Sequence, residues 1–306
     1  MVATNDQWIM ERVGIRERHI ADPGVATSDM AVAAARCALE QRGMDPSEVE
    51  VIIVCTVTPD YMFPSTACLV QNGLGAKGAW GFDLIAACSS FVYGTTTGAN
   101  LIMAGTHKKV LVIGADTMSR IIDYTDRATC VLFGDGAGAV LIEPTNDGDG
   151  QLGFIDFLGE IDGSGGEFLI MPAGGSRLPA SPETVEKRQH YVHQAGQQVF
   201  KYAVRKMYET CRDILARNGL TVADVGALIP HQANLRIIQG AAERLGIAPE
   251  KVSINIERYG NTTAATIPLA ARDFVCQGRL KKGDLVLFAA VGAGYTVGAS
   301  LWRWAY

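Results

Sequence analysis

The chain has 306 residues, of which 48% are hydrophobic and 19% are charged, and its formal net charge is -5. This composition provides a core large enough for two domains or one duplicated domain. It lacks the overall basic character of a nucleic-acid-binding protein, so any anionic partner must be held by a local patch.

Cysteine usage indicates the compartment. The seven cysteines form no CxxC pair and their number is odd, which argues against a zinc site or a disulfide framework and favours a reducing cytoplasm. Charged residues such as Glu11 and Arg12 interrupt any signal peptide at the start, and no apolar run approaches the length of a membrane span. We therefore expect a cytoplasmic protein that binds no metal and no membrane.

The first half of the sequence alternates apolar strand-like runs with helix-like segments. It opens with a short polar helix at 4–13, for which Thr4 or Asn5 is the predicted cap. The further elements predicted in this half are helices at 28–43, 64–72 and 91–104, buried strands at 49–58, 80–87 and 109–115, and two strands joined across glycines within 122–144.

The second half repeats this pattern. Its predicted elements are strands at 151–160, 225–230 and 252–256, helices at 194–218, 233–245 and 263–277, and two strands within 284–302. The first half ends in FGDGAGAVLIE and the second in VGAGYTVGASLW, so both place G-x-G between apolar strands. This weak internal similarity predicts duplicated α/β halves, with helices between or outside two sheets. Only the second half opens with a strand.

Cys88 is the first candidate for chemistry. It lies in FDLIAACSSFVYG, between an apolar strand and a helix for which Ser89 and Ser90 are good starting residues. The free N–H groups at a helix start favour a thiolate, so the pKa of the Cys88 thiol is expected to fall below its ordinary value of about 8.5. Cys88 is therefore a candidate nucleophile, and the alternative is a buried, inert cysteine.

Two further residues follow predicted buried strands at a strand-to-helix turn. His231 begins HQAN after VGALIP, and Asn261 lies in RYGNTTAAT. In α/β proteins ligands bind at the carboxyl ends of the strands, so these side chains and Cys88 can converge if their strands share a sheet end. The alternatives are a helix-capping role for His231 and a structural turn at Asn261.

The glycine-rich run 134-GDGAG-138 has neither GxGxxG spacing nor a following G-K-S/T. It is therefore interpreted as a place of close backbone packing rather than a phosphate-binding loop.

Taken together, AACSSF, PHQANLRII, GNTTAA and GAGYTVGASL resemble the β-ketoacyl-acyl-carrier-protein synthase III family, the initiating condensing enzymes of bacterial fatty acid synthesis. The resemblance covers nearly the whole chain, including WIMERVGIRERHI and TDRATCVLFGDGAGAVL. It implies an α/β thiolase-like fold, with two duplicated halves at 1–147 and 148–306 that form a five-layered α-β-α-β-α sandwich. It also implies a homodimer.

The resemblance implies roles for individual residues. It implies a catalytic triad of Cys88, His231 and Asn261, with an oxyanion hole formed by the amides of Cys88 and Ala293. Phe63 matches a position that reaches across the dimer to close the partner's acyl pocket. Positions that match those binding coenzyme A are Trp8, Arg12, Arg127, Gly196, Phe200 and Asn234, and the basic patch for the acidic carrier protein matches Lys201, Arg236 and Arg244.

The implied reaction is a decarboxylative Claisen condensation of a short acyl-CoA with malonyl-acyl-carrier protein. It needs no metal and no redox cofactor, because the CoA thioester is itself a substrate. The sequence departs from the family in lacking a first strand with a glycine-rich turn, and the segment 172–193 looks longer than in some members, so it is expected to form a loop or a dimer contact.

Two other enzyme functions remain. A thiolase needs a second catalytic cysteine, which 289-AAVGAGYT-296 lacks. A condensing enzyme of polyketide or quinolone synthesis would share the triad and differ in its acceptor. A non-enzymatic binding paralogue would be expected to have lost the triad, and this chain keeps it.

Overall fold

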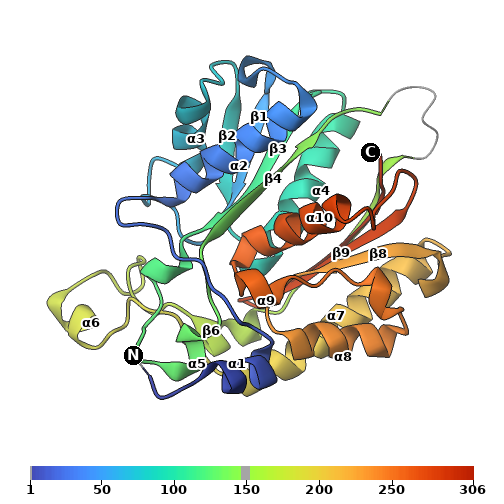
Figure 1. Ribbon diagram of the computed structural model, residues 1–306. Coiled ribbons are helices and arrows are strands. Elements are labelled where there is room, and N and C mark those ends of the chain that lie inside the picture. Colours follow the sequence, from blue (N-terminus) through green and yellow to red (C-terminus); the bar gives the residue numbers. More distant parts are fainter. Residues whose placement is uncertain (1, 146–151) are drawn as a thin grey trace.

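The computed structural model describes residues 2–145 and 152–306, and its core is a pair of four-stranded sheets (Figure 1). The first sheet has the order β2-β1-β3-β4, with the first three strands parallel and the last antiparallel. Its strands are β1 (Val51–Cys55), β2 (Trp80–Leu84), β3 (Val110–Asp116) and β4 (Gly136–Ile142).

The second sheet has the order β5-β10-β9-β8. Strands β8 and β9 are parallel, and β9, β10 and β5 follow in antiparallel pairs. Its strands are β5 (Gly153–Ile161), β8 (Val225–Pro230), β9 (Leu285–Gly292) and β10 (Thr296–Arg303). A small separate pair joins β6 (Leu169–Ile170) and β7 (His193–Gln194).

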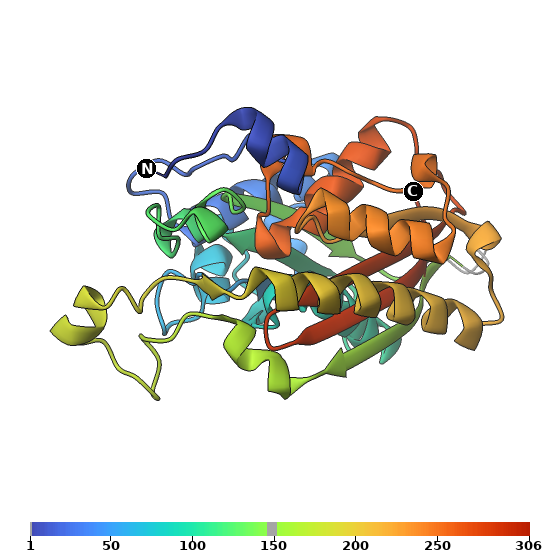
Figure 2. The same ribbon diagram turned by 90° about the horizontal axis from the view of Figure 1, so that it is seen from below.

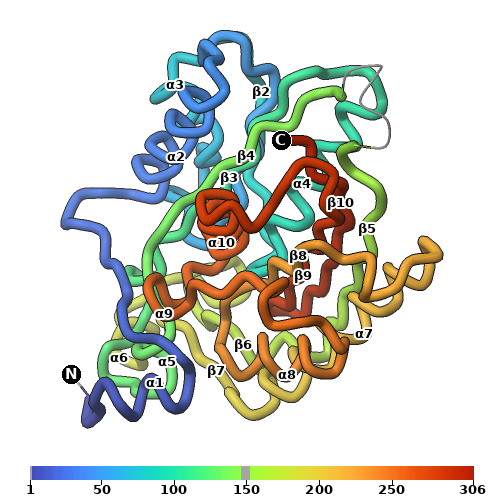
Figure 3. Tube along the Cα trace, turned by 45° about the vertical axis from the view of Figure 1, so that its right-hand side comes forward, coloured from blue at the N-terminus to red at the C-terminus, as the bar shows by residue number. Residues whose placement is uncertain are grey.

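Helices cover both faces of each sheet (Figure 1 and Figure 3). The outer face of the first sheet packs on α2 (Thr27–Arg42) and α3 (Thr66–Leu74), and the outer face of the second packs on α7 (Gly196–Arg217) and α8 (Leu235–Leu245). Between the sheets lie α4 (Ser90–Met103) and α10 (Thr266–Cys276), whose apolar side chains share one cluster with β1, β3, β8 and β9. The expected five-layered α-β-α-β-α sandwich is therefore confirmed.

Strand burial explains why the sequence forms these layers. Every residue of β1, which reads VIIVC, is fully buried. A strand covered by helices on both faces needs an apolar side chain at each position rather than at alternate ones. The same continuous burial holds for β3 and β9.

The halves repeat one topology, as the internal similarity indicates. Strands β8, β9 and β10 correspond to β1, β3 and β4, with the same parallel and antiparallel pairings. Strand β5 borders the outer edge of β10, whereas in the described residues no strand borders the corresponding outer edge of β4. The predicted boundary between residues 147 and 148 lies outside the described residues.

Two predicted strand regions are wrong. Residues 122–144 hold the short helix α5 (Arg127–Cys130) and the single strand β4, because the Asp126 carboxylate accepts the amide of Ala128 and starts a helical turn. Residues 252–256 form only one bridge, between Leu228 and Val252, before α9 (Ile256–Tyr259) begins.

The remaining elements lie around the sandwich. The first helix, α1 (Asp6–Val13), is capped by Asn5 as expected, and its end packs on the start of α8. The segment 172–193 contains α6 (Pro182–Glu186) and projects from the body (Figure 2). Arg188 ties this projection back to the Asp123 carboxylate. No helix of the described residues has both the length and the apolar character that crossing a membrane requires.

Candidate active site

Cys88 lies where the sequence predicts, at the turn between β2 and α4. This turn is the 3₁₀ segment η2 (Ala87–Ser89), and Ala87 adopts a φ of 47°, a left-handed conformation that is uncommon outside glycine. The Ser90 hydroxyl stabilises the turn by donating to the Ala87 carbonyl at 2.5 Å and accepting the Ala86 amide at 2.9 Å. The turn therefore holds Cys88 at the start of α4, with 7% of its surface exposed.

The expected lowering of the Cys88 pKa is wrong for this structure. Burial, assisted by the charge of Asp116, raises the pKa of the Cys88 thiol to about 12, and only the amide of Cys88 itself acts in the other direction. Desolvation disfavours the charged form of any group, and here it outweighs the helix end. Without substrate, Cys88 is therefore a neutral thiol at pH 7.

His231 directly follows β8 and is 1% exposed. Its amide donates to the Ala289 carbonyl of β9 at 2.8 Å, and its Nδ1 lies 2.7 Å from the Thr266 hydroxyl. Its Nε2 is buried and has no hydrogen-bond partner. Burial lowers the pKa of His231 to about 3, so the ring is neutral at physiological pH. The helix-capping interpretation is wrong, since Asn234 caps α8.

The carboxamide of Asn261 has a defined orientation. Its Oδ1 accepts the Thr263 amide at 2.9 Å, which leaves Nδ2 as the atom available to donate elsewhere. The Asn261 backbone is held by Leu132 and Gly134, whose carbonyl and amide pair with it at 2.9 and 3.0 Å. Asn261 thus presents two N–H groups from a fixed backbone position.

The elements that carry these three residues touch one another. The η2 turn of Cys88 packs on η7 (Thr263–Ala265), which follows Asn261, and on the end of β9. His231 reaches the same place through Thr266, the first residue of α10. The arrangement gathers a thiol, a neutral imidazole and a carboxamide at the junction of the two halves.

The loop that was expected to complete an oxyanion hole joins β9 to β10. Its residue Ala293 is half-buried and follows Gly292 directly. A methyl group added at Gly292 would lie 2.7 Å from the amide nitrogen of Cys88. Only glycine permits this close approach, which brings the loop of Ala293 next to the Cys88 turn.

The residues matched to coenzyme A positions come from α1, α5, α7 and α8, and α8 packs on both α1 and α7. Trp8 and Arg12 are on α1, and the Arg127 guanidinium at the start of α5 stacks over the Trp8 ring, 4.9 Å from its centroid. Gly196 and Phe200 are in the first turns of α7, and Asn234 is the cap of α8.

The residues matched to the basic patch are exposed on the two outer helices, with Lys201 on α7 and both Arg236 and Arg244 on α8. The Arg236 guanidinium lies over the Phe200 ring at 5.8 Å, so the patch adjoins the coenzyme A positions. Phe63 is 86% exposed, in a loop next to the exposed Met62.

The glycine-rich run 134–138 is confirmed as a site of close packing. A methyl group at Gly134 would lie 2.9 Å from the Tyr259 carbonyl oxygen, and one at Gly138 would lie 2.8 Å from Pro268. The small residues let β4 approach α9 and α10, which position the Asn261 turn.

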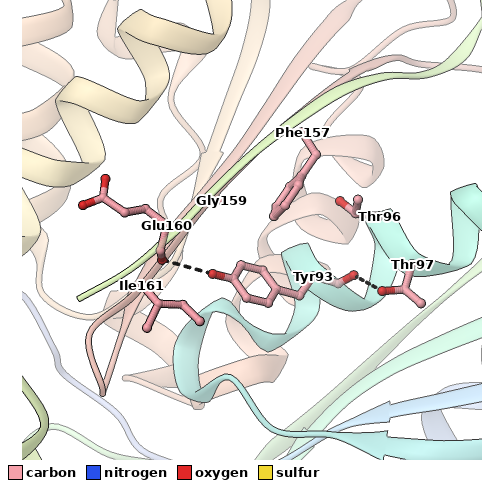
Figure 4. A pocket seen from close by; sticks show the side chains of 7 residues that line it. All are labelled: Tyr93, Thr96, Thr97, Phe157, Gly159, Glu160 and Ile161. Carbon is pink, nitrogen blue, oxygen red and sulfur yellow. Dashed lines mark hydrogen bonds between the residues drawn. The ribbon is translucent and has the colours of Figure 1, made fainter. Parts of the chain in front are cut away.

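A shallow cavity of about 300 Å³ opens elsewhere, between α4 and β5 (Figure 4). The Tyr93 ring meets Phe157 edge to face at 5.4 Å, and its hydroxyl donates to the carbonyls of Val297 and Glu160. The lining is Tyr93, Thr96, Thr97, Phe157, Gly159, Glu160 and Ile161. It includes none of the site residues predicted from the sequence.

Sequence reasoning missed two buried residues that contact the site. Thr266 contacts His231, and Asp116, at the end of β3, accepts the amide of Ala264 at 3.1 Å. A carboxylate that ends an apolar strand, as in KVLVIGAD, is a signal that could have identified Asp116. No comparable signal marks Thr266, because a threonine that opens a helix is ordinary.

Residues 82–160 match the family model described as 3-Oxoacyl-[acyl-carrier-protein (ACP)] synthase III, and residues 215–304 match the model of its C terminal part. A curated relative from Solibacter usitatus, named Beta-ketoacyl-[acyl-carrier-protein] synthase III, is 78% identical over 306 residues, which is 100% of this chain and 92% of the relative.

Solved structures of related enzymes have the same fold as this chain. The 3-oxoacyl-[acyl-carrier-protein] synthase III from Aquifex aeolicus superposes with a TM-score of 0.89 at 44% identity, covering 98% of this chain and 92% of that one. A priming β-ketosynthase from the R1128 polyketide biosynthetic pathway gives a TM-score of 0.90 at 35% identity, covering 99% and 89%. The chain therefore belongs to the β-ketoacyl-[acyl-carrier-protein] synthase III family and is an acyltransferase of the condensing type.

Proposed function

We propose that the chain catalyses decarboxylative condensation of a short acyl-CoA with malonyl-acyl-carrier protein, and thereby initiates fatty acid synthesis. The observation that carries this proposal is the meeting of a turn-held thiol with two neutral hydrogen-bond donors, His231 and Asn261. The 78% identity to a synthase III relative, against 35% to the polyketide priming enzyme, favours fatty acid synthesis over the polyketide alternative.

In the first half-reaction the Cys88 sulfur attacks the acyl-CoA thioester carbonyl. The amides of Cys88 and Ala293 stabilise the oxyanion, and the departing CoA sulfur takes up the proton that the thiol loses. His231 is poorly suited to hold that proton, because its pKa is about 3 while that of Cys88 is about 12. Acylation therefore depends on Cys88, its turn and the arriving thioester.

In the second half-reaction malonyl-carrier protein loses CO₂, and the electron pair of the broken bond forms an enolate on the thioester. His231 Nε2–H and Asn261 Nδ2–H donate to the enolate oxygen. The enolate carbon then attacks the acyl-Cys88 carbonyl and releases the Cys88 sulfur as a thiolate, which takes up a proton from solvent, and the product is a β-ketoacyl-carrier thioester. These donors are neutral and buried, so they stabilise developing negative charge without a proton transfer.

The hydrogen bonds of Thr266 support a donor role for Nε2. The Thr263 carbonyl already accepts the Thr266 backbone amide, and the Thr266 hydroxyl is closer to His231 Nδ1, at 2.7 Å, than to that carbonyl, at 3.0 Å. A hydroxyl that donates to Nδ1 fixes the proton of the neutral ring on Nε2.

Substrate binding is assigned to the residues matched to coenzyme A and carrier-protein positions. Adenine can insert at the stacked pair of Trp8 and Arg127, with Arg12 beside it on the same helix. The second group of matched positions, Gly196, Phe200 and Asn234, would contact the rest of coenzyme A. The carrier protein would dock on Lys201, Arg236 and Arg244 by charge complementarity.

A homodimer is part of the proposal. Phe63, with 86% of its surface exposed, would enter the acyl pocket of a second copy. The neighbouring Met62 and Tyr61 are 81% and 60% exposed, and such a cluster of large apolar side chains marks an interaction site.

The test is a condensation assay with purified protein and acetyl-CoA, run in parallel with malonyl-carrier protein and with malonyl-CoA as acceptor. The proposal expects acetoacetyl-carrier protein by mass spectrometry and little product from malonyl-CoA. Preferential use of malonyl-CoA would instead assign the chain to a different acceptor and pathway.

A further inference from the structure

The Cys88 turn has a counterpart in the second half. Both η2 and η7 begin with a residue in the left-handed region, Ala87 at 47° and Thr263 at 51°, and each leads directly into a central helix. In both, the hydroxyl oxygen of the first helical residue lies within hydrogen-bonding distance of that left-handed residue's carbonyl oxygen, at 2.5 Å for Ser90 and at 3.0 Å for Thr266. By this correspondence Ala264 occupies the place of Cys88.

Each turn meets the end of a strand from the opposite half. The end of β9, at Gly292, packs on η2, and the equivalent end of β3, at Asp116, packs on η7. At η2 the strand end is a glycine, so the space next to the Cys88 amide is not filled by a side chain of β9. At η7 the Asp116 carboxylate fills the equivalent space and accepts the Ala264 amide at 3.1 Å.

Asp116 joins this turn to the first half. It is fully buried, and while its Oδ2 accepts from Ala264, its Oδ1 accepts the Val57 amide at 2.8 Å. The hydroxyls of Thr56 and Thr58 donate to the same Oδ1, both at 3.0 Å. The carboxylate therefore links the loop after β1 to the η7 turn. That turn is strained, because a β-branched residue such as Thr263 would not adopt a φ of 51° unaided.

The linked turn carries both proposed donors. The Thr263 amide, one residue from Ala264, orients the Asn261 carboxamide, and Thr266, two residues beyond Ala264, contacts His231. A shift of the Ala264 backbone would therefore displace both donors together. It would not displace Cys88, whose own turn is closed by Ser90.

We propose that Asp116 is a positioning residue for decarboxylation, because its carboxylate fills the second half's equivalent of the oxyanion hole and thereby fixes Asn261 and His231. This inference rests on the proposed function, in that it assumes that Asn261 and His231 serve the malonyl half-reaction. It separates a residue that supports the second half-reaction from those that support the first.

The test uses Asp116→Ala in the 306-residue chain, with acylation of Cys88 by acetyl-CoA and CO₂ release from labelled malonyl-carrier protein measured separately. CO₂ release is expected to fall by about 10²-fold, the effect of a misplacement on the order of 1 Å. Acylation is expected to be no slower, because Asp116 raises the pKa of Cys88 in the native protein. Added formate should restore part of the CO₂ release by occupying the vacated carboxylate site, and it should not stimulate the native protein.

The matched control is Asp83→Ala. The Asp83 carboxylate also accepts two backbone amides, those of Thr66 and Ala67, but it anchors the start of α3 rather than the Asn261 turn. This variant should keep the native ratio of the two half-reactions and show no response to formate. If Asp116→Ala does not fold, as judged by circular dichroism, then Asp116→Asn provides the comparison and should lose more CO₂ release than acylation.

Equal loss of both half-reactions in a folded Asp116 variant, unchanged CO₂ release, or no recovery with formate in a folded Asp116→Ala would overturn the inference. Failure of the proposed function would be seen separately, as a native protein that releases no CO₂ from malonyl-carrier protein. A native protein that is active beside an unaffected Asp116→Ala would refute only the role of Asp116.

Discussion

The Thr266 hydroxyl lies 2.7 Å from His231 Nδ1, while His231 Nε2 is buried with no partner. One side of the ring is thus bound to the protein and the other side is left for a ligand. The contact joins a residue that follows β8 to one that opens α10. This contact leaves Nε2 as the ring nitrogen that can take part in the chemistry.

Removing this hydroxyl should impair decarboxylation specifically. Thr266→Val keeps the side-chain shape but leaves the buried Nδ1 of His231 without a hydrogen-bond partner. An unsatisfied buried polar group costs about 1–3 kcal/mol of free energy. CO₂ release from labelled malonyl-carrier protein should fall by roughly tenfold to 10²-fold. Thr266→Ser, which restores the hydroxyl, should recover most of it. A Thr266→Val enzyme with native CO₂ release would show that the contact does not set the state of His231.

Burial of His231 predicts a pH dependence of stability. Its pKa falls from 6.5 to about 3 on folding, so between these values the unfolded chain binds the additional proton. The free energy of unfolding should therefore decrease as the pH falls below about 6.5, by up to about 1.4 kcal/mol per pH unit from this residue.

The comparison is between the native protein and His231→Gln, which lacks the titrating group. Urea unfolding of both at several pH values between about 5 and 8 gives the difference in free energy. The free energy of unfolding of the native protein minus that of His231→Gln should be constant above pH 7 and should decrease below about pH 6. A constant difference throughout would contradict the buried, neutral state of His231.

Much of the fold could be predicted because its core segments have simple patterns. The apolar runs of β1, of β3 as far as Ala115 and of β9 indicate strands with no solvent-exposed face, and the sequence predicts the helices α2, α7 and α8 to within a few residues. The segment 252–256 was misassigned for a reason of context. Its alternating apolar residues satisfy a strand pattern, but after Val252 the Asn255 amide pairs with the Gln232 side chain instead of with a strand.

The site was predicted only in part for a similar reason. Cys88, His231 and Asn261 each follow a recognisable apolar segment, so sequence position indicates them. The raised pKa of Cys88 could not be predicted from a helix start, because the outcome depends on how deeply the whole fold buries the thiol. The contact of Asp116 with the Asn261 turn could not be predicted from the sequence either, because its partner Ala264 lies 148 positions away.

Phe63 should limit the length of the primer. If its exposed ring closes the acyl pocket of a partner subunit, primers from acetyl to butyryl size should be preferred, and Phe63→Ala should admit longer chains. Rates with acetyl-CoA and dodecanoyl-CoA give the preference, and Met103→Ala, which removes another exposed side chain at the end of α4, is the control. Equal turnover of both primers by the native protein would remove this role.

The basic patch should affect only the carrier-dependent step. Arg236→Glu or Arg244→Glu should raise the apparent KM for malonyl-carrier protein and barely change acylation by acetyl-CoA, because the carrier is acidic and this chain has a net charge of -5. The affinity of the native protein for the carrier should also weaken with salt.

Lys77→Glu makes the same charge change at an exposed position of the first half and is the control for the patch. It should leave the KM for the carrier at its native value. Unchanged carrier kinetics of Arg236→Glu at low salt would take Arg236 out of the docking surface.

The central claim is that Cys88 carries the acyl group while His231 and Asn261 serve decarboxylation. Cys88→Ala should abolish acylation and retain some CO₂ release. His231→Ala and Asn261→Ala should each lower CO₂ release by roughly 10²-fold or more. The double variant should lose less than the product of the two, because both donors bind one oxygen.

The most direct measurement is mass spectrometry of His231→Ala after incubation with acetyl-CoA. The account predicts one acetyl group on the peptide that contains Cys88, at a level close to that of the native protein, while CO₂ release from labelled malonyl-carrier protein is strongly reduced. If His231→Ala blocks acylation as completely as Cys88→Ala does, then His231 is the base that activates the thiol, and the proposed division of the two half-reactions is wrong.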